Sequence, residues 1–174
     1  MKYEHWQIPA APEDAIKTLM DAGYPYLVSS VLAARGVTTS EQAAEALERE
    51  KTLAHSPFLM KDMDKAVARI SRALENGEKL AVFGDYDVDG CTAVALVYKF
   101  LRQIGHKNLM FYIPDRYTEG YGISVKGIDL AARKGVGLII ALDCGIKATE
   151  KIVYAKSKGV DFIICDHHLP AEEI

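Results

Sequence analysis

The 174-residue chain is long enough for one compact domain with a small extension, and its 49% hydrophobic and 26% charged residues are ordinary for a globular protein. Its formal net charge of −3 lacks the basic excess of a dedicated nucleic-acid-binding domain. The chain has no apolar run that could span a membrane, its start does not resemble a signal peptide, and its three scattered cysteines exclude a disulfide framework. We therefore expect a cytoplasmic protein with no membrane partner.

The first part of the chain has only helical patterns. Gly36 and Gly77 stand where helices end, and Thr39 and Gln42 have the spacing of a capping box. We predict helices over residues 12–22, 26–35, 40–50 and 62–76, and we assign residues 1–77 to an all-helical N-terminal extension.

From residue 78 onward, short apolar runs alternate with amphipathic stretches. The apolar runs predict strands over residues 80–83, 109–113, 138–142 and 160–165, and the stretches between them predict helices over residues 91–104, 124–134 and 149–158. Continuous apolar strands that alternate with helices are typical of βαβ units. We therefore predict an α/β domain over residues 78–174, with a parallel sheet covered by helices on both faces.

Polar side chains follow the carboxyl ends of these strands. In a parallel sheet the carboxyl ends of all strands lie at one rim, and ligands bind at this rim. The second strand is followed by a glycine-rich loop with Arg116, Glu119, Gly120 and Tyr121. The other three are followed by acids and imidazoles: Asp85, Asp87 and Asp89; Asp143; and Asp166, His167 and His168. Three such strand ends together predict a functional site at this rim.

A rim with so many carboxylates requires protons or cations between them. Two unit charges ~4 Å apart repel by roughly 4 kcal/mol at an effective dielectric constant of about 20. Oxygen ligands with one or two imidazoles favour Mn²⁺ or Mg²⁺, and a pair of such ions is the usual device for phosphoester cleavage. The clustering therefore suggests a two-metal phosphoesterase.

Other interpretations of the first acidic loop are weaker. Residues 85–90 match half of an EF-hand loop, but Leu96 stands where that loop requires Glu, and a strand rather than a helix precedes it. Asp87 and Asp89 after a strand also resemble the nucleophile motif of haloacid-dehalogenase-type phosphatases, which would have Thr or Val in place of Cys91. A capped turn without further function is a third interpretation.

The later strand ends also leave alternatives. Asp143 could be the N-cap of the next helix, and Cys144 and Cys165 with His167 could bind zinc, although they lack paired cysteine spacing and suit apolar packing better. We expect the adjacent His167 and His168 side chains to point to opposite sides, so that one binds metal and the other faces the substrate.

These motifs resemble those of the DHH phosphoesterase superfamily. Gly84-Asp-Tyr-Asp-Val-Asp-Gly90 resembles its first motif, Leu142-Asp-Cys-Gly-Ile146 its second, and Asp166-His-His168 its third. The Ile113-Pro-Asp-Arg116 and Glu119-Gly-Tyr-Gly122 loop, and a helical lead-in with Trp6 and residues 57–65, are similar to the RecJ branch. Phe83 stands where small-substrate phosphoesterases of the superfamily carry His, and this favours DNA as the substrate.

The resemblance implies a role for each matching residue. Asp87, Asp89, Asp143 and His167 would bind the metal ions, Asp85 would be a ligand or lie close to one, His168 would face the scissile phosphate, and Asp166 would orient a histidine. Arg116, Glu119, Gly120 and Tyr121 would hold the DNA.

The implied reaction is Mn²⁺- or Mg²⁺-dependent 5′→3′ hydrolysis of single-stranded DNA to 5′-mononucleotides, in DNA repair and recombination. A single-strand-binding protein and a helicase are the implied further partners. The family pattern continues with a fourth motif and a DHH-associated domain, so residues 1–174 alone are expected to bind Mn²⁺ weakly and to degrade DNA poorly.

Two alternative functions stay open. The first is a DHH phosphodiesterase that acts on short oligonucleotides or cyclic dinucleotides. The second is a non-catalytic DHH-like scaffold, although the intact acids and histidines argue against it.

Overall fold

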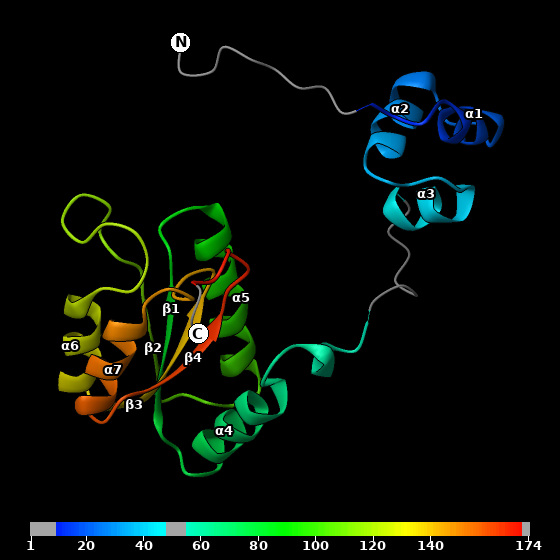
Figure 1. Ribbon diagram of the computed structural model, residues 1–174. Coiled ribbons are helices and arrows are strands. Elements are labelled where there is room, and N and C mark those ends of the chain that lie inside the picture. Colours follow the sequence, from blue (N-terminus) through cyan, green and yellow to red (C-terminus); the bar gives the residue numbers. More distant parts are fainter. Residues whose placement is uncertain (1–9, 48–54, 172–174) are drawn as a thin grey trace. The chain divides into compact units, whose positions relative to one another are not determined.

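The computed structural model describes residues 10–47 and 55–171, and the chain divides into two compact units, Met1–Leu59 and Met60–Ile174 (Figure 1). Trp6 and residues 48–50, which were part of the sequence predictions, lie outside the described residues. In the described part, no helix is both long and apolar enough to cross a membrane.

Within its described residues, the first unit contains three short α-helices at the predicted positions: α1 (Glu13–Asp21), α2 (Tyr26–Ala34) and α3 (Ser40–Leu47). The single turn η2 (Pro57–Leu59) ends this unit. The core consists of small and aliphatic side chains: Ala15, Leu19, Leu32, Ala33 and Ala43.

The predicted capping box is present at the start of α3. The backbone amide of Gln42 donates to Thr39 Oγ1 at 3.3 Å, and the backbone amide of Thr39 donates to the side-chain Oε1 of Gln42 at 3.3 Å. Two free amide groups of the first turn are thereby satisfied, which explains why α3 begins at this point.

The second unit is built on a four-stranded parallel sheet in the order β2-β1-β3-β4. The strands are β1 (Lys79–Gly84), β2 (Leu109–Tyr112), β3 (Val136–Leu142) and β4 (Asp161–Cys165), which agree closely with the predicted ranges. Gly84 pairs with Leu142, and Leu142 pairs with Cys165. Because these three strand ends are in register, the residues that follow them emerge side by side.

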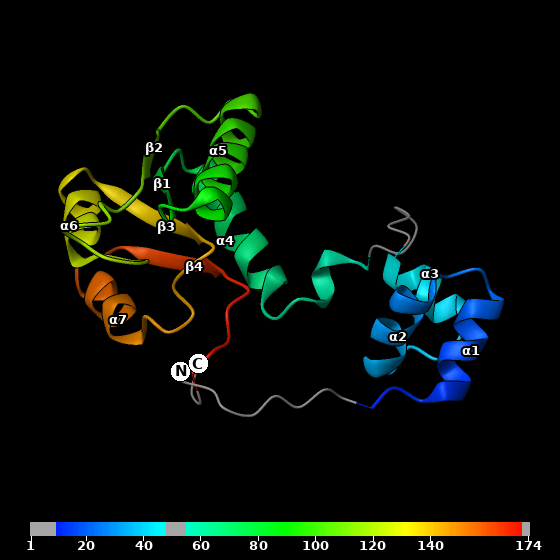
Figure 2. The same ribbon diagram turned by 90° about the horizontal axis from the view of Figure 1, so that it is seen from above.

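Helices cover both faces of the sheet, as Figures 1 and 2 show. The side chains of α4 (Met63–Glu75) and α5 (Val88–Gln103) pack on one face, against Leu80, Val82 and Leu138. The side chains of α6 (Val125–Arg133) and α7 (Thr149–Ser157) pack on the other, against Phe83 and Ile139. The apolar strands are therefore buried on both sides, and the predicted α/β class is confirmed.

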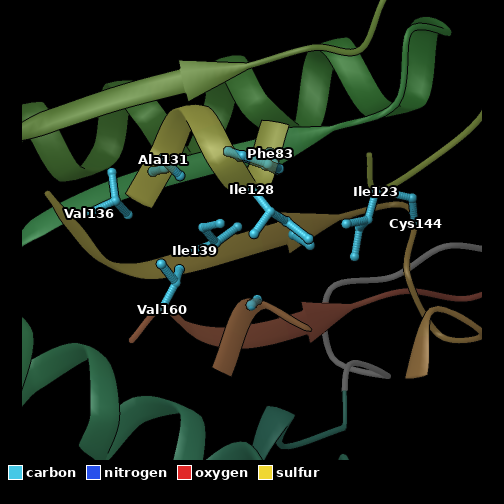
Figure 3. Packing of buried hydrophobic residues seen from close by; sticks show 11 residues of the cluster. Phe83, Ile123, Ile128, Ala131, Val136, Ile139, Cys144 and Val160 are labelled. Carbon is cyan, nitrogen blue, oxygen red and sulfur yellow. The ribbon is translucent and has the colours of Figure 1, made fainter. Parts of the chain in front are cut away.

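Figure 3 shows the core beneath α6 and α7, where Ile128 and Ala131 point from α6 toward β1 and β3. Ile123 and Cys144 lie next to each other at the carboxyl end of β3. Cys144 is 1% exposed and belongs to this apolar cluster, so its packing role is the one expected from the sequence.

The chain changes direction in the sheet between β1 and β3. The connection from β1 to β2 runs through α5 on one face, and that from β2 to β3 runs through α6 on the other. In open α/β sheets such a reversal leaves a crevice at the carboxyl ends of the strands. This fold therefore places Asp85 and Asp143, which follow β1 and β3, at its topological switch point.

Helix α4 belongs to the unit of the sheet and packs against it, whereas the sequence pattern assigned this helix to the N-terminal extension that ends at residue 77. Ala73 is fully buried in the sheet cluster, and Arg69 bonds both Glu78 and Asp161 at 2.8 Å. The change of pattern at residue 78 marks the start of the strands. It carries no information about which unit the preceding helix contacts.

We predict that Gly90→Ala destabilises the chain although alanine is the better helix former. A Cβ at this position in α5 would lie 2.5 Å from the Asp85 carbonyl oxygen and 2.6 Å from its nitrogen, so the backbone must move. Overpacking of this kind costs about 1–3 kcal/mol, against a gain of about 1 kcal/mol in helix propensity. Urea unfolding of the variant measures the difference.

The control is Ala95→Gly at an exposed position of α5, where loss of helix propensity should cost about 1 kcal/mol. A Gly90→Ala variant as stable as the wild type would contradict the close approach of α5 to β1.

Candidate metal and catalytic site

Three carboxylates lie in a row where β1, β3 and β4 end. Asp85, Asp143 and Asp166 each follow a strand directly, and the last residues of these strands are paired in register. The three residues therefore follow neighbouring strands, and the spacing between neighbouring strands of a sheet is about 4.8 Å. Asp85 is fully buried, Asp143 is 9% exposed, and the Asp166 side chain is 2% exposed. The rim therefore concentrates negative charge in a region with little access to water.

The buried Asp85 carboxylate has no hydrogen-bond partner among the described residues. Both of its oxygens are inaccessible to solvent. A buried charge without a partner is costly in free energy, so native proteins pair such groups or use them to bind cations. Asp85 is thus the strongest structural indication of a cation at this rim.

Asp143 has a left-handed backbone, with φ at 60°, which is uncommon for a residue other than glycine. Its amide donates to the Cys165 carbonyl at 2.8 Å, and its Oδ1 lies 2.9 Å from His167 Nε2. Helix α7 has Ala148 as its N-cap, so the interpretation of Asp143 as that cap is wrong. The backbone instead turns this side chain toward the neighbouring strand end.

The two histidines lie together rather than on opposite sides. Their ring centroids are 4.7 Å apart, and ligand atoms of Asp143, His167 and His168 all lie within 4.8 Å of one another. The expectation that they diverge is wrong because β4 ends at Cys165, and side-chain alternation applies only within a strand. Two ligands on opposite sides of a Mg²⁺-sized ion are about 4 Å apart, so this group is close to metal-binding dimensions.

Asp166 orients His168. Its Oδ1 accepts from the His168 amide at 3.1 Å and lies 2.7 Å from Nδ1, while its Oδ2 accepts from the Ile146 amide at 2.9 Å. Burial opposes ionisation of Asp166, but these hydrogen bonds outweigh it and lower its pKa. The hydrogen bond to Asp166 in turn raises the pKa of His168, which favours the imidazolium.

The other two acids of the first motif are exposed. Asp87 is the N-cap of α5, because its Oδ1 accepts from the Gly90 amide at 3.0 Å, and Asp89 lies in the first turn of that helix. The negative charge of Asp87 contributes to the raised pKa of His168. Among the described residues, neither acid belongs to the cluster formed by Asp143 and the two histidines.

The loop after β2 brings Arg116 and Tyr121 to the same rim. The Arg116 guanidinium stacks on the Tyr86 ring, 4.4 Å from its centroid. The Tyr121 hydroxyl donates to the Asp143 carbonyl at 3.2 Å. This hydrogen bond places the phenol at the acidic rim, where burial and the charges of Asp85, Asp143 and Asp166 raise the pKa of Tyr121 to about 12.

Glu119 points into the protein instead of toward the rim. Tyr112 and Ser124 each donate a hydroxyl to its Oε2 at 2.5 Å, and the Asp115 amide donates to Oε1 at 3.1 Å. Gly120, with φ at 77°, turns the chain immediately after it. Glu119 thus holds the loop that carries Arg116 and Tyr121.

A pocket of about 520 Å³ adjoins His168, and this volume is within the range of small-molecule sites. It is lined by Tyr121, Asp166 and His168 and by residues 145–151, which include Lys147 and Lys151. Neither lysine was identified from the sequence, because isolated lysines have no distinctive pattern.

The cysteines do not join the metal-binding group of the described residues. Burial, together with the charges of Asp166, Asp85, Asp143 and Asp87, raises the pKa of Cys144 to about 12. Cys144 packs in the apolar core, and neither cysteine lies with the histidines as a ligand group in the described part of the chain, so the structure gives the zinc alternative no support.

These features define an α/β domain with an acidic, histidine-containing site at the carboxyl ends of its strands. The chain belongs to the DHH family, because the model of the DHH family, N-terminal domain, matches residues 79–174. Its three motifs stand at the strand ends described above.

The chain is similar to several RecJ exonucleases. The chain is 37% identical over 170 residues to the single-stranded-DNA-specific exonuclease RecJ of Bacillus subtilis, covering 97% of this chain and 22% of that protein. It is 33% identical over 155 residues to the Escherichia coli protein of the same name, with coverages of 89% and 26%. The chain therefore spans about a quarter of the curated relatives that it matches.

The structure is similar to solved RecJ structures. A crystal structure of exonuclease RecJ bound to manganese matches with a TM-score of 0.62 and 32% identity, covering 69% of this chain and 30% of that one. A structure of RecJ from Thermus thermophilus in complex with Mn²⁺ has a TM-score of 0.65 at 24% identity, over 95% of this chain and 22% of that one, which supports the shared fold.

We predict that Glu119→Gln destabilises the second unit in a pH-dependent way. Burial disfavours the Glu119 carboxylate, but hydrogen bonds from Ser124, Tyr112, Asp115 and Lys126 lower its pKa from 4.5 to about 2. A carboxylate with a lowered folded-state pKa stabilises the fold above pH 4.5, and this contribution is lost as pH falls toward 2. Urea unfolding at pH 7 should show a loss of about 1–3 kcal/mol.

The difference from wild type should shrink at pH 3.5. Glu75→Gln, at an exposed position in α4, is the matched control and should change stability by less than about 0.5 kcal/mol at either pH. A Glu119→Gln deficit that stays constant between the two pH values would show that the charge of Glu119 is not the stabilising feature.

Proposed function

We propose that this chain forms the metal-binding catalytic domain of a 5′→3′ exonuclease specific for single-stranded DNA. The observation that carries the proposal is the buried, unpartnered Asp85 carboxylate beside the cluster of Asp143, His167 and His168. Membership of the DHH family and similarity to RecJ nucleases support it.

The residues at the rim suit Mn²⁺ or Mg²⁺. Carboxylate oxygens with one or two imidazoles are typical ligands of these ions, and Asp85 supplies a buried negative charge that a cation would neutralise. We infer that Asp87, Asp89, Asp143 and His167 bind the metal pair, with Asp85 as a ligand or directly beside one. A bound metal pair would activate water at neutral pH and neutralise charge on the phosphate.

We infer that His168 acts on the scissile phosphate. Asp166 holds the His168 Nδ1 and favours the protonated ring. His168 lines the pocket, and its Nε2 lies 3.3 Å from the Tyr121 hydroxyl. An imidazolium in this position can donate a hydrogen bond to a phosphoryl oxygen or a proton to the leaving oxygen. Asp166 acts through His168, and this role does not require contact with metal.

The substrate would lie along the loop after β2 and the pocket beside the histidines. Arg116 and Tyr121 face the rim, and Gly120 lets the chain turn between Glu119 and Tyr121. Glu119 would contribute by holding this loop in place, because its carboxylate points inward. Lys147 and Lys151 add positive charge to a domain whose chain is acidic overall.

This proposal also includes the release of 5′-mononucleotides and a role in DNA repair and recombination. It further includes a cytoplasmic location and, as partners, a single-strand-binding protein or a helicase. They follow from the resemblance to the RecJ branch. The proposal also includes weak Mn²⁺ binding and poor nuclease activity of residues 1–174 on their own.

We predict that Asp85→Asn makes the domain more stable without metal but removes its stabilisation by Mn²⁺. The substitution neutralises a buried charge that has no partner in the described residues, and it also removes the group that a cation would neutralise. An ion present at 100 times its Kd stabilises the wild-type fold by about 2.7 kcal/mol. Thermal unfolding of the full-length protein, with EDTA and with Mn²⁺, measures both effects.

Asp64→Asn is the matched control, because Asp64 is an exposed acid in the first turn of α4. Its response to Mn²⁺ should equal that of the wild type. An Asp85→Asn variant whose stabilisation by Mn²⁺ equals that of the wild type would show that Asp85 is not part of the metal site.

We predict that the full-length protein with Mn²⁺ releases mononucleotides from the 5′ end of single-stranded oligonucleotides and leaves duplexes largely intact. Asp143→Ala should lower the rate by at least about 100-fold, because it removes a carboxylate from the centre of the proposed metal site. Oligonucleotides labelled at either end, resolved on denaturing gels, measure the rate and the polarity.

Cleavage of dinucleotides but not of long DNA would instead support the small-substrate phosphodiesterase. Absence of metal-dependent hydrolysis of either substrate would support the scaffold. Residues 1–174 assayed in parallel should be much less active than the full-length protein, and micromolar Mn²⁺ affinity with robust cleavage would contradict that expectation.

A further inference from the structure

Tyr86, between the two acids Asp85 and Asp87, makes its contacts with the face and edge of its ring. The Arg116 guanidinium carbon lies 4.4 Å from the ring centroid, and the Tyr121 ring lies edge-to-face at 6.3 Å with an interplanar angle of 87°. Among the described residues the Tyr86 hydroxyl has no hydrogen bond within the protein. The aromatic ring is therefore the part of this side chain that the surrounding structure uses.

The Tyr86 ring belongs to a continuous row of side chains that ends at the proposed catalytic group. Tyr121 contacts Tyr86 with its ring, donates its hydroxyl to the Asp143 carbonyl at 3.2 Å, and lies edge-to-face with His168 at 5.9 Å. The row Arg116–Tyr86–Tyr121–His168 thus joins the loop after β2 to the ends of β1, β3 and β4.

The stacked geometry gives Arg116 a defined position in an acidic environment. Arg116 is exposed and forms no ion pair with a carboxylate in the part of the chain that the structure describes. Several acids at the rim could otherwise attract a mobile guanidinium. Stacking on an aromatic face restricts the guanidinium plane while its N–H donors stay directed outward, and such donors suit bidentate binding of a phosphate.

We propose that Tyr86 is a positioning residue, which holds the Arg116 guanidinium at the rim so that it can bind a phosphate of the nucleic-acid substrate. This proposal rests on the proposed function, because it assumes that a phosphodiester chain lies along the rim. It assigns Tyr86 a role in substrate affinity rather than in the chemical step. An aromatic ring is required at this position, and the hydroxyl is not.

The test is a double-mutant cycle in the full-length protein with Mn²⁺ and a single-stranded oligonucleotide. Tyr86→Leu should raise KM about three- to tenfold with kcat changed less than twofold, because the interaction acts on binding. Tyr86→Phe keeps the ring and should restore KM to within twofold of the wild type. In an Arg116→Ala background, Tyr86→Leu should have no further effect on KM, since the two residues act as one unit.

A control substitution tests for a general effect of losing an aromatic ring. Tyr98 is half-buried and pairs edge-to-face with Phe111 at 5.7 Å on α5 and β2, so Tyr98→Leu removes a comparable ring elsewhere. Its KM should match that of the wild type, and circular dichroism should show all variants folded.

Several results would overturn the proposal. A fall in kcat with unchanged KM in Tyr86→Leu would place the ring in support of the catalytic cluster, and additive effects of Tyr86→Leu and Arg116→Ala would show that the residues act independently. An Arg116→Ala variant with the KM of the wild type would show that Arg116 does not contribute to substrate binding. An equal loss in Tyr86→Phe and Tyr86→Leu would assign the effect to the hydroxyl.

Binding measured without turnover separates this proposal from the proposed function. Fluorescence anisotropy of the labelled oligonucleotide, with Asp143→Ala as the common background, gives Kd for the same set of variants. If the full-length protein with Asp143 intact cleaves no DNA, and the same coupling between Tyr86 and Arg116 appears in Kd, the nuclease proposal is overturned and this one is supported. If the protein is an active nuclease and neither Kd nor KM shows coupling between Tyr86 and Arg116, the nuclease proposal is supported and the role of Tyr86 is overturned.

Discussion

Repulsion between carboxylates at the carboxyl edge of a parallel sheet is the constraint on which this domain depends. The register of β1, β3 and β4 brings Asp85, Asp143 and Asp166 to adjacent positions, and the helices on both faces exclude water from them. The three carboxylates differ in their hydrogen-bond partners. Asp166 is satisfied by two backbone amides and an imidazole, Asp143 meets His167, and Asp85 has no partner among the described residues. Positive charge supplied at the rim would therefore stabilise this arrangement.

The rest of the domain can be understood as support for that edge. Gly90 allows α5 to begin against the backbone of Asp85, and Asp87 caps the same helix. Glu119 anchors the loop after β2 from inside, through Tyr112 and Ser124, so that the outer side of the loop can present Arg116 and Tyr121. Sites held by buried hydrogen bonds and packed rings keep their geometry, which catalysis by charge stabilisation requires.

Much of the fold could be predicted from local patterns. The strand ranges and the helices between them agree with the structure to within a few residues, because short apolar runs that alternate with amphipathic stretches are a strong local signal of βαβ units. The capping box at Thr39 and Gln42 is also a local feature, and it is confirmed. Patterns of this kind do not reveal partners distant in sequence. They could not show that α4 packs on the sheet through Ala73 and Arg69.

The candidate site shows the same division. The sequence identified the acids and histidines because motifs of charged residues after strands are visible along the chain. It could not predict the close approach of His167 and His168, the inward direction of Glu119, or the stacking of Arg116 on Tyr86. Each of these depends on how loops fold beyond the strand ends, where neither helical nor strand periodicity constrains side-chain direction.

By itself, the sequence determined the α/β class of the sheet domain, the order of its elements and the identity of the chemical groups at one rim. Hydrophobic periodicity and turn residues act over a few positions, and these properties follow from them. The tertiary structure decided which carboxylate is left without a partner, which histidine is held by Asp166, and which ring supports Arg116. Those outcomes depend on distances of a few ångströms between segments far apart in the chain, which only the packing of the sheet, helices and loops establishes.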